Sequence, residues 1–582
     1  MSVESIITKK LDVWTSVIKT KTASGRGSSN KLELYGIKKL RELILELAVQ
    51  GKLVAQNKND KPAIQFLKDL EIAKVKLIEQ GSLKKVKPLA LVDEVELPFS
   101  IPKSWHWERL GNLGNTQTGS TPPKANQEHY GSDIPFIKPA DISDIGVDYD
   151  SMGLTFDGAN KLGRIADEHS VLMVCIGTIG KCQLIDRKCS FNQQINSITP
   201  YVPEFGQYLY QALRSPYFSR LAWDKSSSTT IAILNKGKWE SIPVPVPPLE
   251  EQKRIVVKVE ELMALCDQLE SQTEASIEAH QTLVKSLLET LTNAKDADEL
   301  NESWQRISEH FDVLFTTEDS IDQLKQTILQ LAVMGKLVKQ DPNDEPASKL
   351  LERIAAEKEQ LIKDKKIKKQ TELKEVNESD FPFSTPEGWA VVRLGALIPQ
   401  FQNGVSSRGD KKGKETIVLR LADIKDWRIS ENDTRRLIIN EETIEKYLLK
   451  KGDTLIIRVN GSSEIVGRFI TVEKVTDAIY CDHFIRMRFP IPCIEPNYLA
   501  ILGSSRLVRD KISDLFISTA GQKTVNQTHI SSLTLSIPPV MEQKRISERV
   551  RYLVAICDEL KSKLQTVQRT ISNVADSVKA NY

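Results

Sequence analysis

The chain has few of the features that would place it in a membrane, a secreted scaffold or a metal site. No apolar run follows Met1, and no apolar stretch is long enough to span a bilayer. The seven cysteines include no Cys-x-x-Cys pair. Cys175, Cys182 and Cys189 recur at intervals of seven residues, but without closely spaced partners this pattern does not favour a metal site. We therefore expect buried free thiols in a reducing compartment, and a cytoplasmic protein that contacts no membrane.

The chain also lacks an excess of either charge. It carries 80 Lys and Arg against 78 Asp and Glu, which gives a formal net charge of +2. This balance excludes a bulk polycation, so any contact with nucleic acid must come from local basic patches. Hydrophobic residues make up 40% of the sequence, which is enough for several packed cores.

Motifs for nucleotide or methyl-donor chemistry are missing as well. The string Gly177–Cys182 does not match a P-loop, because its glycine spacing and its last residue differ from Gly-x-x-x-x-Gly-Lys-Ser/Thr. An adenine methyltransferase would carry Asn-Pro-Pro-Phe or Asp-Pro-Pro-Tyr. The nearest strings, Val246–Leu249 and Ile537–Val540, lack the acidic or amide residue and precede predicted helices. No pair of carboxylates at a strand end indicates a nuclease. These absences favour a binding and scaffolding protein.

What the sequence does contain is a duplication. The segment Ala48–Val54 returns as Ala332–Val338, with an offset of 284 residues (332 − 48). Glu251–Ile255 returns as Glu542–Ile546, with an offset of 291 (542 − 251). A period this long exceeds the roughly 20–50 residues of solenoid repeats, so whole domains are duplicated. Two copies of one surface can engage a two-part target or two copies of one partner, and we interpret the repeated blocks as two docking surfaces.

Each half follows the same order of predicted elements. An amphipathic helix comes first, and a glycine, Gly51 or Gly335, ends it. A second short helix follows. Segments 105–245 and 389–537 are then rich in short β-branched and aromatic runs, which predicts compact mixed domains. A proline-rich turn leads from each domain into a long helix. If the first short helices pack beside the last long helix, the chain closes on itself.

The long helices carry heptad patterns typical of coiled coils. In the second helix ten apolar residues alternate four and three apart: Ile546, Val550, Leu553, Cys557, Leu560, Leu564, Val567, Ile571, Val574 and Val578. In the first helix the pattern runs from Ile255 to Leu269, is broken by Thr273, Ser276 and His280, and is predicted to resume at Leu283. We interpret His280 as a seam residue and not as a metal ligand.

Together these features resemble the specificity subunit of type I restriction–modification enzymes. The resemblance is carried by the duplicated blocks and by strings in the first mixed domain, namely Thr118–Pro122, Ile134–Lys138, Ala140–Ile142 and Asn192–Gln194. It covers nearly the whole chain. The long segment before the first mixed domain departs from the commonest layout and resembles a subgroup in which a helical repeat precedes each target domain.

The resemblance implies an α+β fold with two mixed target-recognition domains, long antiparallel coiled-coil helices between them, and a pseudo-twofold duplication. The implied domains are 1–95 (N-terminal segment and helical repeat), 96–245 (first target domain), 246–379 (central helical region), 380–537 (second target domain) and 538–582 (C-terminal helix). The chain itself would be non-catalytic and bind no cofactor. It would read a bipartite, asymmetric site on double-stranded DNA and dock two modification subunits that use S-adenosylmethionine to methylate adenine at N6. Restriction subunits would add ATP- and Mg-dependent translocation and cleavage.

Candidate DNA contacts are polar residues in predicted loops, because Arg and Lys read guanine while Asn and Gln read adenine. In the first domain they are Lys124, Arg164, Lys181, Gln193 and Gln194. In the second domain they are Arg408, Lys411, Lys412, Lys414, Arg458, Asn460, Arg468, Gln522, Lys523 and Thr524. Solvated surface charges and turn formers account equally well for about half of these positions, and phosphate contacts should outnumber base contacts.

Two other functions fit parts of the sequence. A coiled-coil adaptor that reads no DNA would explain the long helices, but not two large, dissimilar domains between matched helices. A methyltransferase with its own cofactor site would need to bind S-adenosylmethionine without a partner.

Overall fold

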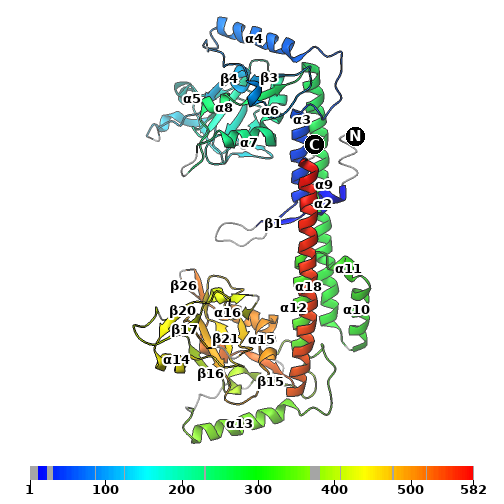
Figure 1. Ribbon diagram of the computed structural model, residues 1–582, viewed down its shortest axis with the longest axis vertical. Helices are drawn as coiled ribbons and strands as arrows, with labels where there is room; N and C mark the ends of the chain where they lie inside the picture. Colours follow the sequence, from blue (N-terminus) through cyan, green and yellow to red (C-terminus); the bar gives the residue numbers. More distant parts are fainter. Residues whose placement is uncertain are drawn as a thin grey trace. The chain divides into compact units, whose positions relative to one another are not determined.

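A computed structural model describes residues 11–21, 31–85, 87–123, 125–227, 231–295, 297–367, 376, 381–406, 408–425, 427–430, 432–474, 477–519 and 521–580. The chain forms two compact units: Met1–Ser276 with Val567–Tyr582, and Ile277–Thr566. Both boundaries fall inside the long helices α9 (Leu249–Asn293) and α18 (Val540–Ala580), so each unit contains a part of each helix (Figure 1).

Short helices open each half of the chain. The first half has α2 (Leu11–Ser16), α3 (Tyr35–Val49) and α4 (Ala63–Glu79), and the second has α10 (Ala297–Glu309), α11 (Phe311–Leu314), α12 (Glu318–Val333) and α13 (Ala347–Lys363). The predicted glycines follow α3 and α12 with positive φ angles, 68° at Gly51 and 73° at Gly335. A Cβ on either glycine would lie within 2.5 Å of Pro102 or Pro386, so these positions require glycine for both conformation and space.

The first mixed domain is built on two four-stranded sheets. One sheet is antiparallel in the order β11 (Cys182–Leu184), β10 (Val171–Val174), β13 (Ile195–Pro200), β4 (Gly114–Thr118). The other has the order β8 (Gly153–Leu154), β5 (Tyr130–Ile137), β12 (Cys189–Phe191), β9 (Ile165–Ala166), and its β5 and β12 are parallel. A strand pair, β3 (His106–Arg109) and β14 (Pro243–Val246), joins the two ends of the domain, and β6 (Ile142–Ser143) pairs with β7 (Gly146–Val147). The helices are α5 (Phe156–Leu162), α6 (Phe205–Arg214), α7 (Pro216–Asp224) and α8 (Lys236–Glu240).

The second mixed domain repeats the main sheets, although the sheet with its parallel pair has three strands and not four. Its antiparallel sheet is β16 (Gln400–Asn403), β25 (Phe484–Arg488), β21 (Thr454–Ile457), β23 (Phe469–Thr471), and its other main sheet is β20 (Arg436–Ile439), β17 (Lys414–Leu419), β24 (Ala478–Tyr480). Here β17 and β24 are parallel, as β5 and β12 are in the first domain. The closing pair is β15 (Ala390–Arg393) with β28 (Thr534–Ile537), and β18 (Ile424–Lys425) pairs with β19 (Arg428–Ile429). The helices are α14 (Glu441–Tyr447), α15 (Pro496–Ser504), α16 (Arg506–Leu515) and α17 (Gln527–Ser531).

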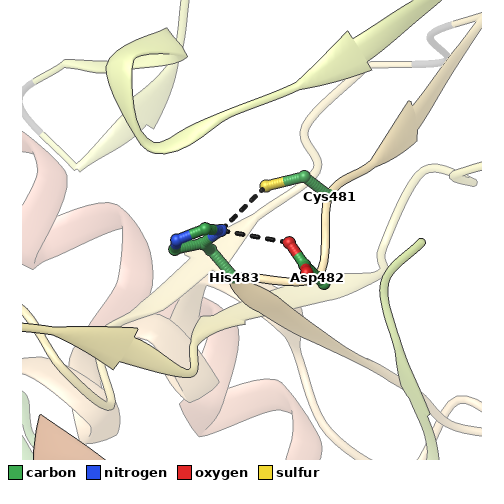
Figure 2. Close-up of side chains that lie close together, drawn as sticks. All are labelled: Cys481, Asp482 and His483. Carbon is green, nitrogen blue, oxygen red and sulfur yellow. Dashed lines mark hydrogen bonds and ion pairs between the residues drawn. The ribbon is translucent and has the colours of Figure 1, made fainter. Parts of the chain in front are cut away.

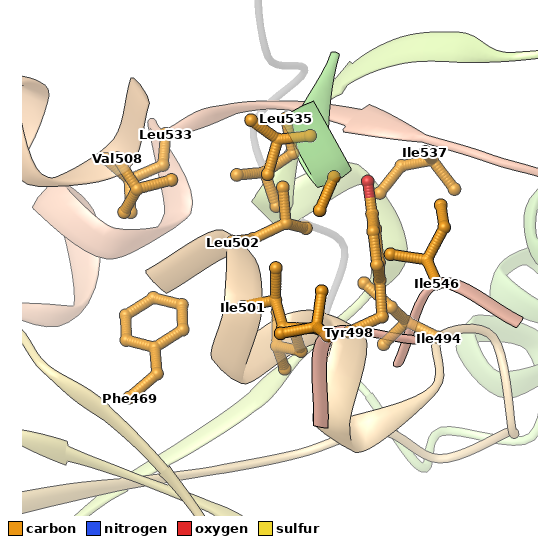
Figure 3. Packing of buried hydrophobic residues seen from close by; sticks show 14 of the residues in the cluster. Phe469, Ile494, Tyr498, Ile501, Leu502, Val508, Leu533, Leu535, Ile537 and Ile546 are labelled. Carbon is orange, nitrogen blue, oxygen red and sulfur yellow. The ribbon is translucent and has the colours of Figure 1, made fainter. Parts of the chain in front are cut away.

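The core of the second domain continues into the start of its long helix. Figure 3 shows Tyr498 and Leu502 of α15 in one cluster with Leu535 of β28 and Ile546 of α18. Tyr498 Oη also donates to the carbonyl oxygen of Ser536, at 3.0 Å. The first domain has the same bond, from Tyr208 Oη to the carbonyl of Pro245 at 2.7 Å. The start of α18 is therefore packed directly onto the domain that precedes it.

The predicted heptad seams are correct at the start of each long helix and wrong further along. Ile255 through Leu269 supply the buried positions of α9 as expected. Leu283, however, is 51% exposed, and its neighbour Val284 is buried instead. In α18, Val567 and Val574 are 52% and 41% exposed, while Ala575 is fully buried. A straight α-helix drifts by about 20° per heptad from a strict seven-residue repeat, which moves the buried face by about one position over this length.

The expected closure of the chain is present within the first unit. The end of α18 belongs to the same compact unit as α3, and Tyr35 Oη donates to Asp576 Oδ1 at 3.0 Å. In the second unit, His280 lies 3.0 Å from the carbonyl oxygen of Leu314, at the end of α11, so this polar seam residue joins two helices. The seven cysteines are unpaired, and six are buried. Among the described residues, no helix combines the length and the hydropathy needed to cross a membrane.

Candidate nucleic-acid interface

The duplicated Glu-Gln-Lys-Arg-Ile block holds each long helix to its domain. Glu251 of α9 is buried and accepts hydrogen bonds from Trp105 Nε1, at 3.0 Å, and from Gln56 Nε2. One turn later Arg254 Nη2 pairs with Asp60, at 2.6 Å. We call these residues the first junction. Burial raises the pKa of Glu251, and the two hydrogen bonds oppose that shift.

The second junction repeats these contacts. Glu542 accepts from Trp389 Nε1 and from Gln340 Nε2, each at 3.1 Å, and Arg545 Nη2 pairs with Asp344 at 2.6 Å. The repeated glutamates are therefore used inside the chain. Our interpretation of the whole repeated blocks as docking surfaces is wrong for these buried positions, because a partner cannot reach them.

The candidate residues of the first domain are gathered only in part. Gln193 stands at the tip of a four-residue turn, in which Ile195 N donates to the Asn192 carbonyl at 3.1 Å. The Gln193 side chain is exposed and accepts from Thr121 Oγ1 at 2.6 Å. The Gln194 side chain is bound within the turn, because its Oε1 accepts a hydrogen bond from Asn192 Nδ2 at 3.1 Å.

The other first-domain candidates lie apart from this tip in the chain. Lys181 is half-buried and donates to the carbonyl oxygen of Pro139 at 3.0 Å. Arg164 is exposed just after α5. Lys124 lies outside the described residues.

A hollow of about 660 Å³ opens beside the turn, and sequence reasoning missed it. Its lining mixes aromatic, amide and hydroxyl groups with one cation: Thr121, Gln127, Tyr130, Phe136, Lys138, Met152 and Asn192. These residues come from five separate stretches of sequence, so no local motif indicates them.

In the second domain the fold joins two groups of candidates that are far apart in sequence. Strand β22 (Val459–Asn460) pairs with β27 (Gln522–Thr524), and Asn460 lies opposite Lys523. Strand β26 (Ile517–Thr519) completes this small sheet. Arg458 precedes β22, and its Nη1 lies 3.5 Å from the carbonyl oxygen of Asp482. Arg458 thus lies beside a turn that the sequence analysis did not single out. Asn460 and Gln522–Thr524 are strand residues, so the prediction that they lie in loops is wrong.

That turn carries Cys481, Asp482 and His483 (Figure 2). His483 Nδ1 lies 3.1 Å from Asp482 Oδ1 and 3.8 Å from Cys481 Sγ. Burial raises the pKa of the Cys481 thiol. The residues escaped notice because they contain neither Arg, Lys nor an amide, and only a comparison of the two domains strand by strand reveals their position.

Arg408, Lys411 and Lys412 lie in an exposed loop, as predicted. Lys414 is also exposed, but it is the first residue of β17, so its assignment to the loop is wrong. The loop is anchored by Asp410, whose carboxylate accepts from the backbone N and the Nδ2 of Asn440, at 2.8 and 2.9 Å. The loop is therefore tied to the start of α14 while its cations remain available to solvent.

Arg468 is placed differently from the other candidates. Its guanidinium lies 4.4 Å above the Trp427 ring, and its side chain is only 11% exposed. Burial lowers its pKa. A contact between Arg468 and DNA stays a prediction, and in the structure this side chain supports the packing of Trp427.

Comparisons with known proteins agree with this arrangement of two similar domains. The family described as "Type I restriction modification DNA specificity domain" matches residues 102–279 and 386–568. The chain is 36% identical, over 99% of both chains, to the specificity subunit of the type I restriction enzyme EcoEI from Escherichia coli. It is likewise 36% identical, over 99% of both, to the EcoAI specificity subunit from the same organism.

A similar fold is found among solved structures. One chain, from work described as "Structural basis underlying complex assembly and conformational transition of the type I R-M system", superposes with a TM-score of 0.50. The match has 16% sequence identity and covers 83% of this chain and 98% of the other.

Proposed function

This chain belongs to the specificity subunits of type I restriction–modification enzymes, and we propose that its two mixed domains each read one half of a split, asymmetric DNA site. The observation that carries the proposal is that the two domains have similar strands but different residues in their exposed turns. Both domains share the strand order of their antiparallel sheet, a parallel strand pair and a closing pair, yet the exposed turns at matching places carry different residues. Two readers of one design with different tips suit a target whose two halves differ.

Contacts to the DNA backbone would come from the exposed cations. Lys411 and Lys412 lie in a loop whose base is fixed by Asp410, so they can meet phosphates without ordering a long segment. Because the whole chain is nearly neutral, affinity would depend on such local patches and would fall as salt rises. Base choice would come from the turns and from the sheet that contains Asn460 and Lys523.

The long helices would carry the partners. Outside the first junction, α9 exposes Val257, and outside the second, α18 exposes Tyr552. Such apolar side chains on otherwise polar helices suit protein contacts. We propose that two modification subunits dock here, bind S-adenosylmethionine and methylate adenine at N6, and that restriction subunits supply the ATP- and Mg-dependent cleavage.

The division of labour has a physical basis. Methylation of adenine inside a duplex requires the base to leave the stack, at a cost of a few kcal/mol. A reader that is held rigidly on its helix can keep its grip on the duplex while another subunit distorts it. The paired junctions, which fix each domain to its long helix by Trp–Glu and Arg–Asp contacts, provide that rigidity.

Mapping of methylated adenine tests the proposal. DNA from cells that contain the modification subunits is compared with and without this chain, and we expect a split sequence to be methylated only when the chain is present. No chain-dependent methylation would contradict the proposal and favour an adaptor that reads no DNA. Saturable binding of S-adenosylmethionine to the purified chain alone would favour a methyltransferase instead.

A further inference from the structure

The turn that carries Cys481, Asp482 and His483 occupies the same place as the turn Asn192–Ile195 of the first domain. The turn of the first domain follows β12, which pairs in parallel with β5, and the turn of the second domain follows β24, which pairs in parallel with β17. Asn192 N donates to the Ile137 carbonyl at 3.0 Å, and Cys481 N donates to the Leu419 carbonyl at the same distance. Cys481 is therefore the counterpart of Asn192.

The remaining bonds of the two turns match as well. Each turn is closed by one bond between its ends, from Ile195 N to the Asn192 carbonyl and from Phe484 N to the Cys481 carbonyl, both at 3.1 Å. A neighbouring loop meets each turn through a glycine: Gly119 N donates to the Ile195 carbonyl at 3.0 Å, and Gly404 N to the Phe484 carbonyl at 3.0 Å.

A third strand completes the correspondence. Cys175 N donates to the Gln194 carbonyl at 2.8 Å, and Arg458 N donates to the His483 carbonyl at 2.7 Å. By this register, Asp482 stands where Gln193 stands and His483 where Gln194 stands. The two central positions of the turn are thus amides in one domain and an acid with an imidazole in the other.

The chemistry of this replacement fits a base edge better than a phosphate or a metal. A carboxylate close to phosphates is repelled, whereas Asp accepts a hydrogen bond from the exocyclic amino group of cytosine in the major groove. His483 Nδ1 lies 3.1 Å from Asp482 Oδ1, so in the tautomer that carries the proton on Nδ1 the imidazole donates to that oxygen and leaves Oδ2 free of a bond to His483. The same turn in the first domain holds Asn and two Gln, none of which favours zinc, so a shared role of the two turns is not metal binding.

We propose that Cys481–Phe484 is the base-reading turn of the second domain, in which Asp482 accepts a hydrogen bond from an exocyclic amino group, that of cytosine in particular, and His483 positions the carboxylate. The inference rests on the proposed function, because it presumes that the second domain reads DNA. It adds two specificity-determining residues to the exposed cations, which would then serve mainly as phosphate contacts.

The test uses the full chain in complex with its modification subunits. Asp482→Asn keeps the shape of the side chain but turns one acceptor into a donor. Methylation is measured by sequencing on a plasmid library in which both half-sites are randomised. We expect the preference at one position of the second half-site to weaken about 5- to 150-fold, the range for one mismatched base pair, while the first half-site keeps its sequence. Glu442→Gln, which neutralises an exposed carboxylate on α14 of the same domain, is the matched control and should change nothing.

The other outcomes decide against the proposal. An unchanged second half-site with Asp482→Asn overturns it and leaves the proposed function standing, whereas a wild-type complex that methylates no split site refutes the proposed function itself. If Asp482→Asn abolishes methylation, binding of the variant complex is measured on duplexes that differ by one base pair. An equal loss on all of them overturns the proposal, because the turn would then support folding only. A chelator is also added to the wild-type complex. If it changes the base preference as much as Asp482→Asn does, the turn is a metal site and the proposal is overturned.

Discussion

The first junction offers a direct measure of how firmly a recognition domain is attached to its helix. Glu251→Ala removes the carboxylate that accepts from Trp105 Nε1 and Gln56 Nε2. Trp105 is buried, so its N–H would lose its only partner among the described residues without gaining water, while the exposed Gln56 amide can be solvated. A buried donor left unpaired costs about 1–3 kcal/mol, and bonds to a charged acceptor lie at the upper end of the range.

We therefore expect Glu251→Ala to lower the free energy of unfolding by about 2–4 kcal/mol, which includes the small cavity left by the side chain. For a unit as large as Met1–Ser276 with Val567–Tyr582, a loss of 1 kcal/mol lowers the melting temperature by about 2 °C. The expected fall is thus roughly 4–8 °C in the transition of the first unit. Calorimetry measures the shift, and hydrogen exchange of the 96–245 amides assigns it to this domain.

The matched control is Glu250→Ala. Glu250 is the preceding residue of the same helix, is exposed, and forms a surface pair with Lys253 at 3.2 Å. Its removal should cost no more than about 0.5 kcal/mol. Glu542→Ala should reproduce the effect of Glu251→Ala in the second unit. If Glu251→Ala and Glu250→Ala have the same melting temperature, the first junction does not hold the domain and the reasoning fails.

Four further predictions follow from the same contacts and surfaces. Burial raises the pKa of Glu251 in the folded chain, so the protonated carboxyl stabilises the fold at pH below the unfolded pKa of ~4.3, and this stabilisation is lost as pH rises through the folded pKa. The loss of melting temperature caused by Glu251→Gln should therefore be largest at low pH. A loss that grows with pH would contradict the raised pKa. Replacing about 105–245 by the corresponding domain of a relative should change one half of the methylated sequence, and a change in both halves or in neither would show that the domains are not modular. Mass measurement at saturating partner should find two modification subunits per chain, and a stable one-to-one complex would refute this count. Replacing Lys411, Lys412 and Lys414 together by Gln should reduce the slope of log affinity against log salt by up to about 2.7, at ~0.9 for each phosphate contact, and an unchanged slope would remove the loop from the interface.

The architecture could be read from the sequence because its signals are local and repeated. Gly51 and Gly335 end their helices for a reason that a single position reveals, since only glycine adopts that backbone conformation without strain. The start of each heptad seam is also local, because Ile255 and Ile546 begin a pattern of fixed period. The seam predictions failed at Leu283 and Val567, where the buried face depends on accumulated helical drift and on which helix packs alongside.

The candidate site was much harder to predict. Gln193 was found because an amide at a turn is a familiar DNA contact, and the structure places it at an exposed tip. Asp482 and His483 were missed because an acid and an imidazole on their own indicate nothing. Their equivalence to the two glutamines depends on parallel pairing between β17 and β24, strands that begin 64 residues apart in the chain (478 − 414).

The sequence by itself determined the duplication, the order of helices and mixed domains, and the glycines and prolines that separate them, because each of these is encoded by residues close together in the chain. The tertiary structure alone decided which side chains of the repeated blocks are buried. It also decided which face of each long helix is covered, and which residues of the two domains stand at the same tip. These features depend on contacts such as Glu251 with Trp105 and Arg458 with the Asp482 turn, which join residues distant in sequence. Packing and strand pairing select such contacts only when the whole domain folds.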